Sequence, residues 1–153
     1  MRLVLSLVAA LLATAAAEDC PDNFILIGFG CYSFPSFETT WDDANEYCKF
    51  MAPPGTIGGL AHIEDCTQHA NLWKHIEAQP DGKVNYWIGG KDEEEEGTFR
   101  WVSTGFEIPS EVPFWYPHQP DGWTSENALS LSKTGYFADE SESLLQKFIC
   151  QLL

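Results

Sequence analysis

The stretch Tyr86-Trp87-Ile88-Gly89 marks the point where the hydrophobic pattern of the chain changes from helical to strand-like, and this change decides the fold class. Two segments with helical spacing lie before it. After it, short apolar segments that are strand candidates recur at 99–102, 128–131, 136–138 and 148–150. Two more strand candidates, residues 24–27 and 31–34, precede the helices. Strands, then helices, then strands predict an α+β domain and not alternating βαβ units.

Both predicted helices begin at a capping residue. Thr40 and Asp43 have the spacing of a capping box, with Asp in the position usually taken by Glu. Apolar residues then recur at steps of three and four over residues 41–51, which is typical of one helix face. Asp65 caps the second helix, which we expect to run through about residue 78 before a Pro-Asp-Gly stop.

A long segment between residues 101 and 128 is rich in Pro, Gly and aromatic residues. Irregular loops of this length inside a compact domain are usually functional. Within it, His118-Gln119-Pro120-Asp121-Gly122-Trp123 places an amide oxygen and a carboxylate on either side of a proline, followed by a Trp. Such oxygens suit calcium, and a flat aromatic beside them suits a sugar. The alternative is an ordinary polar turn, since Pro-Asp-Gly is common turn chemistry.

The N-terminal residues 1–17 have the features of a secretory signal peptide. Arg2 gives a positive start, residues 3–13 are apolar, and three alanines at 15–17 form a small-residue cleavage site. The apolar stretch is too short to span a membrane. We therefore expect a secreted, extracellular protein with a single domain at residues 18–153 and no membrane insertion.

Acidic side chains far outnumber basic ones, 23 against 8, which gives a net charge of −15. Such a chain repels nucleic acid and anionic membranes, so we predict no nucleic-acid partner. The charge would attract cations such as calcium, although solubility of a secreted protein explains most of it equally well. No nucleophile–base pair or metal-hydrolase spacing is visible, and we therefore do not expect an enzyme.

The chain has five cysteines, an odd number that leaves one without an internal partner. Secreted proteins keep disulfides, but the sequence alone does not give their connectivity. The short spacing of Cys20 and Cys31 suits a hairpin staple, and Cys48 and Cys150 would tie the body of the domain to its C-terminal end. Cys66 directly follows a helix cap and should be exposed, either as a free thiol or in an interchain disulfide.

Taken in order, these landmarks resemble the C-type lectin domain over essentially all of residues 18–153. Cys20 and Cys31 are similar to the extra N-terminal pair of its long form. The other matching segments are Trp41/Ala44/Cys48, Trp87-Ile88-Gly89-Gly90, Phe99-Arg100-Trp101, Gln119-Pro120-Asp121 and Phe148-Ile149-Cys150-Gln151. The resemblance implies two helices packed on small antiparallel sheets, with a long irregular loop that binds calcium and sugar. We predict the disulfides Cys20–Cys31 and Cys48–Cys150.

The resemblance also implies a binding site. Calcium would be held by Gln119, Asp121, Glu126 and Asp139, and the same four residues would bind carbohydrate together with Trp123. The Gln-Pro-Asp order is associated with galactose-type ligands, and the family uses a cis bond before this proline. For Trp123, stacking on a sugar and filling the loop core both remain open.

A second, auxiliary calcium position is implied at Asp92 and Glu96, within a run that otherwise looks like a solvated acidic segment. Two further side-chain positions of that auxiliary site correspond to Gly122 and Asn127. Because glycine has no side-chain oxygen, the auxiliary ligand set is incomplete.

Two departures from the family pattern matter. The Trp-Asn-Asp triplet of the family corresponds to residues 137–139, where Ala138 lacks the amide oxygen of Asn. A second family disulfide would join positions 128 and 142, which are Ala and Glu here. Because a disulfide typically stabilises the folded state by about 2–4 kcal/mol, its loss predicts a more mobile loop half.

The sequence thus predicts a secreted, calcium-dependent lectin for galactose or N-acetylgalactosamine. By family analogy it would serve innate immunity by recognising or agglutinating microbes through their surface glycans. Agglutination requires at least two sites, and a homodimer linked through Cys66 would supply them. The alternative is a C-type-lectin-like module that binds a protein or surface ligand without calcium or sugar.

Overall fold

The structure is a computed structural model that describes residues 20–153, so the predicted signal peptide at 1–17 lies outside the described part. Within that part, no helix is both long and apolar enough to cross a membrane. The elements, in chain order, are β1 (Ile25–Ile27), β2 (Gly30–Ser33), α1 (Trp41–Met51), β3 (Gly58–Leu60), α2 (Cys66–Glu77), β4 (Tyr86–Lys91), β5 (Arg100–Trp101), η1 (Trp123–Ser125), β6 (Ala128–Leu131), β7 (Phe137–Glu140), β8 (Lys147–Phe148) and β9 (Cys150–Leu152).

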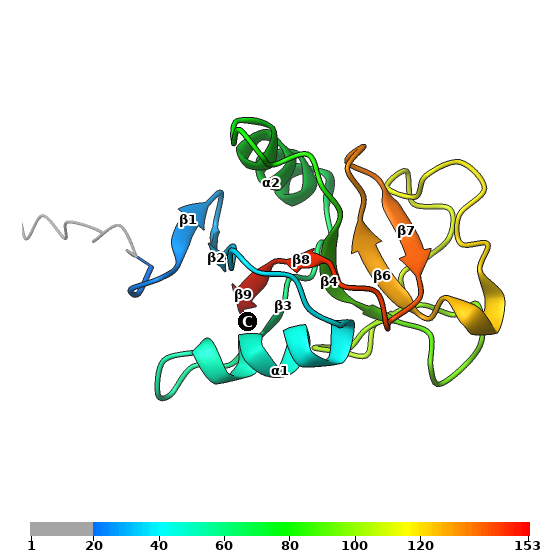
Figure 1. The fold of residues 1–153 in the computed structure, drawn as a ribbon, viewed down its shortest axis with the longest axis horizontal. Coiled ribbons are helices and arrows are strands. Elements are labelled where there is room, and N and C mark those ends of the chain that lie inside the picture. Colours follow the sequence, from blue (N-terminus) through cyan, green and yellow to red (C-terminus); the bar gives the residue numbers. More distant parts are fainter. Residues whose placement is uncertain (1–19) are drawn as a thin grey trace, which may run out of the picture.

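The strands form two sheets, which confirms the α+β prediction. The first has the order β1-β2-β9-β3 and is antiparallel throughout. The second has the order β5-β4-β6-β7, also antiparallel, and β8 adds to β4 in parallel. Because β9 lies between β2 and β3, the two ends of the domain meet in one sheet (Figure 1). The long loop that follows β5 lies beside β6 and β7, away from this sheet.

Both helices begin at the predicted caps. The Thr40 hydroxyl accepts a hydrogen bond from the backbone N–H of Asp43, and the Asp65 carboxylate accepts from the two backbone N–H groups of residues 67 and 68. Each helix then turns an apolar face inward. Trp41, Ala44 and Cys48 are the buried residues of α1, and Leu72 and Ile76 are those of α2.

Strand β3 lies between the two helices in chain order, at a position where the sequence predicts no strand. Its Gly-Gly-Leu sequence has low β-propensity. Tight packing against α1 requires glycine here, because a Cβ on Gly58 would lie 2.5 Å from the carbonyl oxygen of Cys48. The glycine that lets α1 approach the sheet therefore also removes the sequence signal for a strand.

Two disulfides hold the first sheet. Cys20–Cys31 closes the β1–β2 hairpin with a Cα–Cα distance of 5.5 Å. Cys48–Cys150 joins α1 to β9 with a Cα–Cα distance of 5.1 Å. Cys66 at the start of α2 is exposed and forms no disulfide within residues 20–153.

Aromatic packing anchors the long loop to the second sheet. Phe114 and Trp115 in the loop are both buried. The ring centroid of Trp115 lies 5.3 Å from that of Phe99 and 6.0 Å from that of Phe137. The loop therefore contributes Phe114 and Trp115 to the core a few residues before the Gln119-Pro120-Asp121 triplet.

Candidate functional site

Three carboxylates from separate parts of the loop region come together at one place. Asp121 precedes η1, Glu126 follows it, and Asp139 lies in β7. Each offers one oxygen, and these oxygens lie within 4.8 Å of one another. In the sequence, η1 and strand β6 lie between Asp121 and Asp139, so it is the fold that brings these residues together. Oxygen ligands at this spacing are the donor set that calcium prefers.

Asp139 fixes the position of the loop as well as offering oxygens. Its side chain is buried, and it accepts hydrogen bonds from the backbone N–H of Asp121 (3.0 Å) and of Gly122 (2.8 Å). These bonds join the tip of the loop to β7. Since carboxylate–amide bonds are charge-assisted, they are among the stronger polar contacts.

Gln119 completes this group of oxygens. Its Oε1 accepts from the backbone N–H of Asp139 at 3.0 Å, and its Nε2 donates to Oδ1 of Asp121 at 2.7 Å. The Gln119–Pro120 peptide bond is cis, as the resemblance implied. All four residues predicted as calcium ligands thus lie together.

The charge of this cluster is concentrated. Burial raises the pKa of Glu126, and the nearby carboxylates of Asp139 and Asp121 raise it further. Burial is also the main cause that raises the pKa of Asp92, with a smaller contribution from the charge of Asp139. Carboxylates whose ionised forms repel one another favour a cation between them.

The predicted auxiliary pair lies next to the triplet. Asp92, Glu96, Gln119, Asp121, Trp123 and Asp139 all line one hollow of about 420 Å³. One carboxylate oxygen of Asp92 accepts from the backbone N–H of Gly97 at 2.8 Å. Its other oxygen, Oδ1, and the side-chain oxygen of Asn127 are buried and have no hydrogen-bond partner among the described residues. Buried oxygens without a partner are uncommon, and a bound cation would satisfy them.

Gly122 contributes space and no ligand. A Cβ at this position would collide with the side chain of Glu126. Glu126 therefore packs over the position where the auxiliary site of the family has one of its side chains. Any auxiliary cation here would depend on Asp92, Glu96 and the side-chain oxygen of Asn127.

Trp123 does not fill the loop core. Its side chain is 76% exposed, and its φ of 46° places the backbone in the left-handed region at the start of η1. The alternative in which this residue plugs the loop is therefore wrong. An exposed indole on the wall of the acidic hollow is available to a ligand.

Residue 138 supplies no side-chain oxygen. Two residues further along β7, Glu140 is an acid near the site that the sequence prediction did not include. Glu140 accepts from the side-chain Nδ2 of Asn85 at 3.3 Å. Burial raises its pKa first, and the charges of Glu126 and Asp139 raise it further. Because successive side chains of a strand point to opposite faces of the sheet, the position of Glu140 after Asp139 in β7 gave no signal for this proximity.

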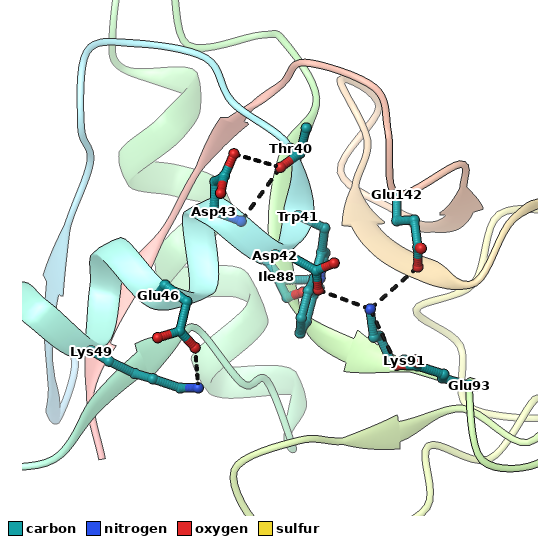
Figure 2. A network of polar contacts seen from close by, with 10 residues as sticks. All are labelled: Thr40, Trp41, Asp42, Asp43, Glu46, Lys49, Ile88, Lys91, Glu93 and Glu142. Atoms are coloured by element: carbon teal, nitrogen blue, oxygen red, sulfur yellow. Dashed lines mark hydrogen bonds and ion pairs between the residues drawn. The ribbon is translucent and has the colours of Figure 1, made fainter.

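An ion-pair network occupies the region where the resemblance expected a second disulfide. Lys91 lies within 3.3 Å of carboxylate oxygens on Asp42, Glu93 and Glu142, and its Nζ lies 4.7 Å from the centroid of the Trp41 ring (Figure 2). The side chain of Lys91 is only 9% exposed. Burial lowers the pKa of Lys91, but the contacts with Asp42 and Glu142 outweigh it and raise this pKa overall.

Three histidines lie partly covered by other residues. His62, His69 and His75 are all half-buried. The Nε2 of His69 lies 2.7 Å from the carbonyl oxygen of Gly135, and its ring stacks on Phe114 with centroids 5.0 Å apart. The residues that cover His69 are therefore far from it in the sequence.

Comparison with known proteins agrees with this geometry. The family model described as the lectin C-type domain matches residues 38–152. Salivary C-type lectin 2 of Aedes albopictus is 33% identical, over 79% of this chain and 73% of that protein. A C-type lectin galactose-binding isoform of Pseudechis australis is 27% identical, over 99% of this chain and 94% of that protein. The chain spans only 32% of a longer human relative, C-type lectin domain family 17, member A, and 42% of rat asialoglycoprotein receptor 2.

Solved structures share the architecture. The C-type lectin CEL-I from Cucumaria echinata has a TM-score of 0.73 and 27% identity, covering 88% of this chain and 97% of that one. A calcium-independent type II antifreeze protein has a TM-score of 0.69 and 21% identity, covering 88% and 95%. At that identity the second likeness shows the fold alone.

Proposed function

Since the chain belongs to the C-type lectin domain family, whose members are carbohydrate-binding proteins that generally bind calcium, we propose that it is a secreted, calcium-dependent lectin for galactose-type sugars. The observation that carries this proposal is the gathering of Gln119, Asp121, Glu126 and Asp139 around one point. These residues come from three segments of the chain, and their oxygens suit one calcium ion.

In this proposal the four residues that hold calcium also contact the sugar and determine which sugar binds. A bound calcium supplies coordination positions for two neighbouring sugar hydroxyls. The amide of Gln119 can donate a hydrogen bond to one hydroxyl, and the carboxylate of Asp121 can accept one from the other. The bond to the Asp121 carboxylate is charge-assisted and worth about 1.5–3 kcal/mol, whereas a bond from the neutral Gln119 amide is worth about 0.5–1.5 kcal/mol. The order of donor and acceptor is what favours galactose or N-acetylgalactosamine over mannose.

Trp123 adds the apolar part of the recognition. A galactose ring has one face rich in C–H groups, and an exposed indole beside the acidic hollow offers a matching surface. The galactose-binding relative from Pseudechis australis supports the same sugar class. The proposed biological role, recognition or agglutination of microbes in innate immunity, rests on family analogy.

A second calcium is part of the proposal, at lower affinity. The buried side-chain oxygens of Asp92 and Asn127, which have no hydrogen-bond partner among the described residues, support it together with the exposed carboxylate of Glu96. The missing side chain at Gly122 weakens it.

Ala138 favours a second candidate function. Without the Asn amide, the primary site has one oxygen fewer than a complete family site, and a module that binds a protein or surface ligand without calcium or sugar would tolerate this. The fold itself does not decide between them, since the antifreeze protein with this fold is described as calcium-independent.

Calorimetry separates the two candidates. The purified protein is titrated with calcium chloride, and then with galactose and mannose in the presence of calcium. The lectin proposal expects calcium uptake at up to millimolar concentrations and a preference for galactose. Absence of calcium uptake would leave only the calcium-independent module.

A further inference from the structure

A second hollow, separate from the acidic one, lies between the β1–β2 hairpin, the end of α2 and the start of β4. Its volume is about 520 Å³, and its apolar walls come from Tyr32, Phe34, Ile76 and Tyr86. We call it the Tyr86 hollow. It shares no residue with the hollow at the proposed calcium site. Cys66 does not line it either, and about 15 Å of helix separates Cys66 from Ile76 at about 1.5 Å per residue.

Aromatic rings form much of the lining. The ring of Phe34 lies edge-on to that of Tyr86, with centroids 6.2 Å apart, and its centroid lies 5.1 Å from that of the His75 ring. Burial lowers the pKa of His75, so this ring is neutral at neutral pH and adds no charge. Aromatic side chains prefer other rings as edge-on or offset partners. We therefore expect the apolar part of a ligand in this hollow to be aromatic.

The hydroxyl group of Tyr86 has no protein partner. Tyr86 is only 5% exposed, and its hydroxyl forms no hydrogen bond with any residue between 20 and 153. Buried tyrosines usually find such a partner. The oxygen is still reached by solvent, unlike the fully covered side-chain oxygens of Asp92, Asn127 and Gln146 that also lack a partner. Since Tyr86 lines the hollow, a ligand there would supply the missing hydrogen bond.

Lys147 places an unpaired positive charge beside this hydroxyl. Strand β8 runs parallel to β4, with Lys147 opposite Tyr86 and Phe148 opposite Trp87 (Figure 1). Phe148 and Trp87 pack with residues of α1. Because side chains alternate along a strand, Tyr86 and Lys147 lie together on the other face, where the hollow is. Lys147 takes part in none of the ion pairs among the described residues, although the chain has 23 acidic side chains.

The polar groups that meet at this wall are hydrogen-bond donors. A phenol hydroxyl and an ammonium group both donate to a carboxylate, and bonds to ionised groups are the stronger ones. Asp81 is the one acid in the lining, but it is exposed in the turn after α2 and is not paired with Lys147. The charge left unbalanced beside the aromatic wall is therefore positive.

We propose that the Tyr86 hollow binds a small aromatic carboxylic acid. Its ring packs against Phe34, and its carboxylate accepts hydrogen bonds from the Tyr86 hydroxyl and the Lys147 ammonium group. The volume falls within the range of about 300–1,000 Å³ that is usual for small-ligand sites. The inference goes beyond the lectin proposal and does not depend on it, because the two hollows share no residue.

The test uses a matched set of naphthalene compounds. Calorimetry in EDTA measures 2-naphthoate, the neutral 2-naphthalenemethanol and the cationic 2-naphthylmethylamine, with octanoate as an aliphatic acid. We expect 2-naphthoate to bind with a dissociation constant of about 0.1–1 mM. It should bind about tenfold more tightly than the alcohol, because hydrogen bonds to a charged group are stronger than those to a neutral one. The amine and octanoate should bind more weakly than 2-naphthoate.

Substitutions and amide NMR spectra locate the site. Lys147→Gln should weaken 2-naphthoate binding about tenfold and leave the alcohol unaffected, and Tyr86→Phe should weaken it about threefold. Lys74→Gln is the control, because Lys74 is exposed on α2 outside the lining and its loss changes the net charge equally. Amide signals of residues 79–82 and of Lys147 should shift with 2-naphthoate, and those of residues 119–123 should not. Thermal unfolding verifies that each variant is folded.

The outcomes are distinct. The site is overturned if 2-naphthoate does not bind at millimolar concentrations, if it binds no more tightly than the alcohol, or if Lys74→Gln weakens it as much as Lys147→Gln. If a peptide that ends in a free phenylalanine carboxylate binds about tenfold more tightly than 2-naphthoate, the occupant is the end of another protein and the small-acid assignment is wrong. Because every measurement is made in EDTA, none of these outcomes decides the lectin proposal.

Discussion

The ammonium group of Lys91 lies 3.2 Å from a carboxylate oxygen of Glu142. Lys91 ends β4 and Glu142 follows β7, so this ion pair joins two parts of the second sheet. Asp42 on α1 contacts the same ammonium group at 3.0 Å, which extends the link to a helix (Figure 2). Position 142 is where the family pattern has a cysteine. An ion-pair network around the buried ammonium group of Lys91 therefore holds the region in which a disulfide is missing.

Replacing Lys91 should destabilise the protein. Lys91→Met leaves the carboxylates of Asp42 and Glu142 without their partner, and we expect a loss of about 1–3 kcal/mol in the free energy of unfolding, below the cost of breaking a fully buried pair because both acids reach solvent. Urea unfolding measures it. The control is Lys49→Met, which removes an exposed pair with Glu46 at 2.7 Å and should cost no more than about 0.5 kcal/mol. Equal effects of the two substitutions would show that the network adds nothing.

Restoring the missing oxygen should strengthen calcium binding. Ala138→Asn returns an amide to β7 beside Asp139, and we expect calcium affinity to rise by about tenfold as one further oxygen joins the ligand set. Calorimetry with calcium chloride measures the change. Ala138→Val, which fills space without an oxygen, is the control and should not improve affinity. Equal calcium binding by the Asn and Val variants would contradict the assignment of this position.

Exchanging donor and acceptor should change sugar preference. The double substitution Gln119→Glu with Asp121→Asn produces the order associated with mannose-type ligands, and we expect preference to move from galactose to mannose. Competition of free sugars against immobilised galactose, and separately against immobilised mannan, measures this. A wild-type protein inhibited equally by both sugars would refute the proposed galactose preference.

Cys66 should link two chains. It is exposed at the start of α2, whereas the other four cysteines pair within the chain. Non-reducing electrophoresis of the secreted protein should show a dimer that disappears on reduction and in Cys66→Ser. Two linked sites should raise avidity for a glycan surface by about 10²–10⁴, so agglutination should fall in this variant while monosaccharide affinity stays constant. A wild-type monomer with a titratable thiol would exclude the covalent dimer.

The elements that depend on local signals could be predicted from the sequence. The helix starts at Thr40 and Asp65 follow from hydrogen bonds within three residues of the cap. The α+β class follows from the order of the apolar segments. Strand β3 could not be predicted, because its glycines serve a packing requirement set by α1, and such a requirement is not visible in the strand itself.

The candidate site was only partly predictable. The resemblance identified Gln119, Asp121, Glu126 and Asp139, and the structure brings them together. It gave no information on the exposure of Trp123, which depends on the backbone conformation at the start of η1. The Lys91 network could not be predicted either, because it depends on residues more than forty positions apart that meet only in the folded chain.

Retention on galactose-agarose tests the central claim most directly. The secreted protein is applied in millimolar calcium and washed with EDTA, and the Gln119→Ala/Asp121→Ala variant is applied in parallel. Calcium-dependent galactose binding predicts that the wild type is retained, that EDTA releases it, and that the variant passes through although its thermal unfolding is unchanged. Passage of the wild type in calcium, or retention that persists in EDTA, would contradict the proposed function.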